Sequence, residues 1–156
     1  MKNDTTVKQK IGIMPTDFNF KQFIVTALIV SIWINISEVF RYFVIVVPTM
    51  KDYLSILPGV VPMNWSIFAS WGVWDAILTA LVVFVYWLVV QSFGNSLMST
   101  FIAATTSWAL FFLLFWLGMV NMGLAPVSIA LIALPLALVE MLVACLISSK
   151  LYTKYL

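Results

Sequence analysis

Four apolar runs, each long enough to cross a lipid bilayer, occupy most of this chain of 156 residues. They cover about residues 22–47, 66–91, 98–119 and 126–149. A transmembrane helix needs about 20 consecutive apolar residues, and every run meets that length. Charged residues make up 9% of the chain, against about 25% in soluble domains. The sequence therefore predicts an all-α integral membrane protein, a bundle of four transmembrane helices joined by short loops.

The segments outside these runs are short, and their lysines predict the orientation in the membrane. We expect residues 1–21 to form an N-terminal arm, residues 150–156 to form a C-terminal tail, and Pro48 to end the first span. The arm holds four lysines and the tail two, whereas the loop 48–65 holds one. Lysine and arginine are enriched on the cytoplasmic side of a membrane. We therefore expect both termini in the cytoplasm, and the protein in the cytoplasmic (inner) membrane of a bacterium.

The remaining composition excludes several function classes. The chain has no histidine and a single cysteine, Cys145, so it lacks the usual ligands of zinc and haem. The net charge of +2 is too small to favour nucleic-acid binding. No nucleophile motif or cofactor fingerprint is visible. We expect no catalytic residues, no metal, no cofactor and no nucleic-acid partner.

Ionisable residues inside the apolar runs are the main functional signal. Glu38 and Arg41 lie in the first run, Asp75 in the second and Glu140 in the fourth. Each costs about 2.5–3.5 kcal/mol at the centre of a bilayer, and such residues usually mark a functional site. At 1.5 Å per residue, Glu38, Arg41 and Asp75 fall about 10–14 Å below the outer boundary and Glu140 about 20 Å below it. Three of the four charges therefore share one depth.

Neighbouring residues complete the candidate site. Glu38 and Arg41 are three positions apart, so they lie on one helix face and can pair. Asn35 and Tyr42 continue that face, and two tryptophans flank Asp75 in a way that can cage an organic cation. The candidate residues for substrate and proton binding are Asn35, Glu38, Arg41, Tyr42, Trp71, Trp74, Asp75 and Glu140.

Glu140 lies on a stripe of small residues in the fourth run. Small residues allow close helix approach, so we expect Glu140 to face another helix. One turn earlier, Pro135 is expected to kink the helix and free the carbonyl group of Leu131. Arg41 is expected to hold Glu38 and to reach Asp75, which leaves Glu140 as the least paired acid. A buried carboxyl group without a counter-charge takes up a proton, so Glu140 is the expected proton carrier.

These features allow three functions from different classes. The first is transport or binding of a small cation or polar solute with proton exchange. The second is a structural or assembly subunit of a larger membrane complex, in which the charges pair with a partner or only fix helix register. An enzyme that modifies lipids through carboxylate chemistry is a third, with least support. We also expect a homo-oligomer, with contacts on the small face of the fourth span or at Ala103, Ser107 and Gly118 of the third.

Overall fold

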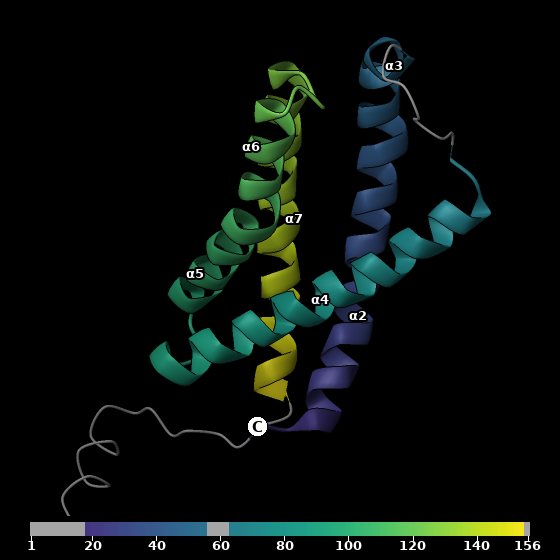
Figure 1. Cartoon of the computed structure of the whole chain (residues 1–156). Coiled ribbons are helices and arrows are strands. Elements are labelled where there is room, and N and C mark those ends of the chain that lie inside the picture. The colour runs from purple at the N-terminus through teal and green to yellow at the C-terminus, as the bar shows by residue number, and fades with distance from the viewer. Residues whose placement is uncertain (1–17, 56–62, 155–156) are drawn as a thin grey trace, which may run out of the picture.

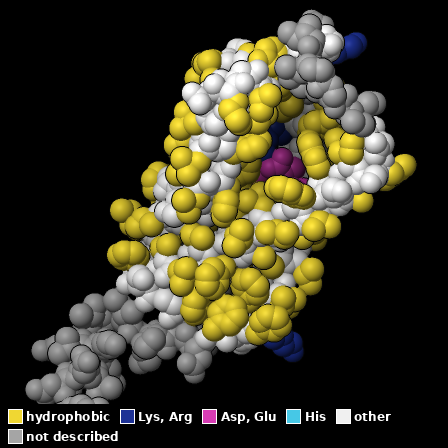
Figure 2. Space-filling view, in the orientation of Figure 1, with side chains coloured by type: hydrophobic (Ala, Val, Ile, Leu, Met, Phe, Trp, Pro, Cys, Tyr) yellow, Lys and Arg dark blue, Asp and Glu magenta, His cyan; other side chains and the backbone are white. Residues whose placement is uncertain are grey.

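The computed structural model describes residues 18–55 and 63–154. In these ranges every regular element is a helix and no strand occurs. Four helices are long and apolar enough to span a membrane, and they cover Phe20–Lys51, Trp65–Phe93, Leu97–Asn121 and Val127–Tyr152. The predicted all-α class and the four long apolar helices are confirmed for the described residues, and they suggest an integral membrane protein. Large apolar side chains cover much of the outward surface (Figure 2).

The first helix is longer than expected. It consists of α2 (Phe20–Phe40), the π-helical segment η1 (Arg41–Val46) and α3 (Val47–Ser55). The expectation that Pro48 ends this span is wrong, because the helix continues through the proline. In η1 the amide of Val47 bonds to the carbonyl of Tyr42, five residues back, and this wider turn accommodates a residue that cannot donate to the usual partner.

Local signals set the limits of the second and third helices. Asn64 caps the start of α4 (Trp65–Phe93) by accepting a hydrogen bond from the amide of Ile67, and Gly94 ends it with φ of 75°. The third helix consists of α5 (Leu97–Trp108), the π-helical segment η2 (Ala109–Leu113) and α6 (Leu114–Asn121). It ends at Gly123, whose φ of 67° suits glycine, as the sequence predicts.

The fourth helix, α7 (Val127–Lys154), is packed against each of the other three spans (Figure 1). Its small residues face inward as predicted. Fully buried or nearly buried positions on this face are Ala130, Ala133, Ala137, Glu140, Ala144 and Ser148. The expectation that this face and Ala103 or Ser107 of α5 contact a second copy is wrong, because these positions are already buried within the chain. Gly118 of α6, the remaining expected contact, is partly exposed, and the homo-oligomer stays a prediction.

Helix α4 crosses the bundle obliquely, and only its C-terminal half is packed (Figure 1). Its buried residues all lie between Thr79 and Val90. In the N-terminal half, Trp65 is 85% exposed and Trp74 is 74% exposed. The N-terminal half therefore diverges from the first helix, and this divergence opens the cavity described below.

Candidate functional site

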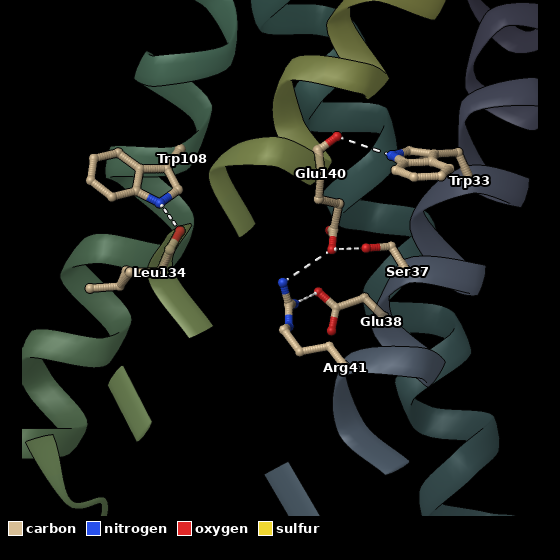
Figure 3. A network of polar contacts seen from close by, with 7 residues as sticks. All are labelled: Trp33, Ser37, Glu38, Arg41, Trp108, Leu134 and Glu140. Atoms are coloured by element: carbon tan, nitrogen blue, oxygen red, sulfur yellow. Dashed lines mark hydrogen bonds and ion pairs between the residues drawn. The ribbon is translucent and has the colours of Figure 1, made fainter. Parts of the chain in front are cut away.

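Arg41 joins the first helix to the fourth. It is the first residue of η1 and is only 7% exposed. Its Nη2 atom forms an ion pair with Glu38 Oε1, and its Nη1 atom lies 3.1 Å from Glu140 Oε2 (Figure 3). The guanidinium carbon also lies 5.0 Å from the ring centre of Phe112 in η2, within the range of a cation–π contact. One side chain thus contacts three of the four spans.

Glu140 lies at the centre of this network and has no exposed surface. Its Oε2 atom accepts a hydrogen bond of 2.6 Å from the hydroxyl group of Ser37 as well as the bond from Arg41. Its backbone carbonyl accepts a bond of 3.1 Å from the indole nitrogen of Trp33 (Figure 3). The other carboxyl oxygen, Oε1, is buried and has no hydrogen-bond partner among the described residues.

The network has an unbalanced charge. Two carboxyl groups share one guanidinium group, so full ionisation leaves one net negative charge among buried groups. A buried charge without compensation costs several kcal/mol. A proton on the unpartnered Oε1 atom of Glu140 would remove that charge without disturbing a bond already made, and Oε1 is the fully buried one of the two acids' unpartnered oxygens in the described ranges.

Asp75 lies across a cavity from this network. The cavity separates the first helix from the N-terminal half of α4, and the volume open to water centres is about 40 Å³. Polar or aromatic residues in its lining are Asn35, Glu38, Tyr42, Phe43, Phe68, Trp71 and Asp75. The Asp75 side chain has no hydrogen bond or ion pair with any residue in the described ranges. Figure 2 shows acidic side chains at the floor of a hollow on this face.

An aromatic pair closes part of the cavity. The rings of Tyr42 and Trp71 meet edge to face, with centres 4.7 Å apart. Trp74 does not line the cavity, and it points away from the bundle. The structure therefore does not form a cage of two tryptophans around Asp75, and Trp74 is exposed on the outer surface of the bundle. The aromatic side of the site comes from the first helix and Trp71 instead.

Seven of the eight predicted residues converge, but their pairing differs from the expectation. Arg41 holds Glu38 as predicted, yet its second partner is Glu140 and not Asp75. Asp75, expected to be paired, is the acid without a partner among the described residues. The extra length of the first helix corrects the expected depths: Glu38 and Glu140 each lie thirteen residues inside the ends of their spans at Lys51 and Val127, so they share one depth.

Sequence reasoning missed three members of the network. Ser37 lies four residues before Arg41, so helical spacing could have identified it. Trp33 lies four residues before Ser37 on the same side of the helix. Phe112 carried no such signal, because its contact with Arg41 depends on how the third helix packs against the first.

Pro135 lies inside α7, and a tryptophan of the third span binds to α7 directly beside it. The indole nitrogen of Trp108 donates a hydrogen bond of 2.8 Å to the carbonyl of Leu134, the residue directly before the proline (Figure 3). This bond ties α5 to α7 close to Glu140. The carbonyl of Leu131, which the proline is expected to free, has no side-chain partner in the described ranges.

The site contains acidic side chains, one arginine and aromatic rings. The described residues contain no group of three acidic, cysteine or histidine side chains able to hold a metal ion. Comparisons of the chain with protein-family models, with curated proteins and with solved structures found no match. The function must therefore be argued from the chemistry of the site itself.

Proposed function

We propose that the protein resides in a bacterial cytoplasmic membrane and transports or binds a small cation or polar solute with proton exchange. The supporting observation is that all four ionisable residues of the apolar helices converge within one chain, beside a cavity. A subunit that used its charges to recruit a partner would turn them outward. Here Arg41 and Glu140 are buried instead.

In this proposal Glu140 carries the proton and the cavity receives the solute. A cation that enters beside Asp75 and Glu38 repels the guanidinium group of Arg41 and shifts its pairing toward Glu140. A closer guanidinium group stabilises the ionised form of Glu140, which then releases its proton. Departure of the cation reverses these steps, so one cation is exchanged for one proton.

Proton movement in liposomes tests this coupling. Purified protein is reconstituted with a pH-sensitive dye inside, and gradients of Na⁺, K⁺ or tetramethylammonium are imposed in turn. We expect at least one gradient to drive proton movement above that of protein-free liposomes. Glu140→Gln should abolish this movement, because the amide keeps the shape of the side chain but releases no proton. Ser148→Ala is the matched control, since it removes a buried polar group from the same face of α7.

Infrared difference spectroscopy tests the premise independently of the solute. The absorption of a protonated carboxyl group at pH 7 should be present in the protein and missing in Glu140→Gln. An ionised Glu140 at pH 7 without added solute contradicts the proposed proton carrier. If Glu140→Gln leaves every measured property unchanged, the network only fixes helix packing.

The proposed topology has its own test. With four spans and both described ends of the chain at one end of the bundle (Figure 1), a reporter fused after Leu156 should be accessible only from the cytoplasm. Accessibility only from outside would overturn the orientation inferred from the lysines.

An assembly role is the second candidate, and the N-terminal half of α4 favours it. That half packs against little else in the chain, and Trp74 is 74% exposed there. A partner helix or a second copy fits beside it. Gentle purification in native lipid would support this role if another protein, or a second copy, remained bound at fixed stoichiometry and was lost on Trp74→Glu.

A further inference from the structure

The cavity between the first helix and α4 has a lining that discriminates among cations. Resting on the transport or binding role proposed above, we propose that its ligand is a primary ammonium group attached to an apolar body. The argument uses the size of the cavity, its acceptor atoms and its aromatic walls.

Cavity size argues against an inorganic ion that keeps its water shell. One water molecule needs about 10–15 Å³ of the space open to water centres, and the cavity offers about 40 Å³. A cavity with room for about three water molecules is too small for an ion with a complete shell of six waters. For an ion without its shell, the described residues hold no group of three acidic, cysteine or histidine side chains that could bind a metal.

The acceptor atoms match a primary ammonium group. Such a group donates three hydrogen bonds and accepts none. Three side chains in the lining have oxygens without a partner among the described residues. Asp75 has its whole carboxylate, Glu38 has the oxygen that Arg41 does not hold, and Asn35 has its amide oxygen, because its amide nitrogen donates to Ser31.

The aromatic walls of the cavity favour a ligand with an apolar body. Four of the ten lining residues are aromatic, namely Tyr42, Phe43, Phe68 and Trp71. Aromatic faces attract a cation and also pack against hydrocarbon. Asp75 lies ten residues inside the span that begins at Trp65, which places it about 15 Å along the helix. A charged ligand group that reaches this depth lies between apolar helices, so binding is favoured when the rest of the ligand is apolar.

Calorimetric titration of the protein in phosphatidylcholine nanodiscs tests the proposal, because this lipid has no primary ammonium group. The probes are n-butylammonium, tetramethylammonium, Na⁺ and neutral n-butanol, with empty nanodiscs as the baseline. We expect one molecule of n-butylammonium to bind per chain. Tetramethylammonium, Na⁺ and butanol should bind at least about tenfold more weakly, since each lacks the three donors, the apolar body or the charge.

Two variants locate the site, and one serves as control. Asp75→Asn and Asn35→Leu should each weaken n-butylammonium binding about tenfold or more, because each removes an acceptor. Neither side chain contacts Arg41 in the structure, and unfolding curves in the same nanodiscs check that both variants fold. Trp74→Phe should bind as the unaltered protein does, because Trp74 lies outside the cavity.

The outcomes separate this proposal from the function on which it rests. If Na⁺ or tetramethylammonium binds as well as n-butylammonium, the ligand class is wrong while a cation-binding role stands. If binding is unchanged in Asp75→Asn, the assigned site is wrong. If no cation binds and no gradient drives proton movement, both proposals fail. Competition by phosphatidylethanolamine nanodiscs would identify a lipid headgroup, and not a free amine, as the source of the ammonium group.

Discussion

The two ends of the bundle bury polar groups in opposite ways. At the end near the described termini, Asn95 accepts hydrogen bonds from the hydroxyl groups of Tyr86 and Ser149 and donates to the carbonyl of Ser149. This cluster is neutral, and it ties α4 and α7 to the turn that precedes α5. At the other end, Glu38, Arg41, Asp75 and Glu140 are charged or ionisable, and several of their oxygens have no partner in the described ranges.

The comparison distinguishes polar groups that stabilise the fold from polar groups that remain available to bind a proton or a ligand. A buried neutral network with every member satisfied rigidifies a structure. A network with an unpartnered carboxyl oxygen beside a cavity is stabilised further when a proton or a ligand binds to it. Mutations at the neutral end should therefore change stability alone, whereas mutations at the charged end should change stability and binding together.

The largest effect is expected for Arg41→Ala. Glu38 and Glu140 then lose their shared counter-charge, and breaking a buried pair in this way typically costs about 3–5 kcal/mol. The free energy of unfolding, measured by denaturant titration in mild detergent, should fall by this amount. Adding Glu140→Gln should restore part of it, because the most deeply buried charge is removed. Adding Asp75→Asn should restore little, and equal rescue by both would contradict the pairing in the structure.

Asn95→Leu should have the largest effect at the neutral end. It leaves the buried hydroxyl group of Tyr86 without its acceptor, and an unsatisfied buried polar group costs about 1–3 kcal/mol. The same denaturant titration measures this loss. Affinity for cations should not change, because Asn95 does not line the cavity. A change in affinity would show that the two ends are coupled.

Much of the fold could be predicted from local sequence features. The four apolar runs predict four long helices, and the glycine at 123 predicts the end of the third. The spacing of Glu38 and Arg41 predicts their pairing, and the small residues of α7 predict its buried face. Each of these inferences uses residues within one helix, where spacing alone determines which side chains share a face.

The missed features depend on relations between helices. The partner of Glu140 could not be predicted while Pro48 was expected to end the first span, because that error shifted Glu38 and Arg41 by about one helical turn. The π-helical segments η1 and η2 have no recognised sequence signature. The divergence of the N-terminal half of α4 from the first helix, which opens the cavity, is likewise indicated by no pattern within α4.

A smaller effect is expected at Trp108 in the third span. Its indole nitrogen donates to the carbonyl of Leu134, so Trp108→Phe removes one neutral hydrogen bond while keeping an aromatic ring. The expected loss in the free energy of unfolding is about 0.5–1.5 kcal/mol. Proton movement and cation affinity should be unchanged. If proton movement or cation affinity is lost, the hydrogen bond between α5 and α7 positions Glu140.

The smallest effects distinguish the two tryptophans beside Asp75. Trp74→Phe changes a side chain that is 74% exposed, so the free energy of unfolding should change by no more than about 0.5 kcal/mol. Trp71→Phe alters the edge-to-face contact with Tyr42, and such contacts contribute about 0.5–1.5 kcal/mol. Because Trp71 lines the cavity and Trp74 does not, only Trp71→Phe should also weaken n-butylammonium binding in the calorimetric titration. Equal weakening by both variants would mean that α4 turns when the ligand binds and brings Trp74 toward Asp75, so the charged end would then be mobile as well as incompletely paired.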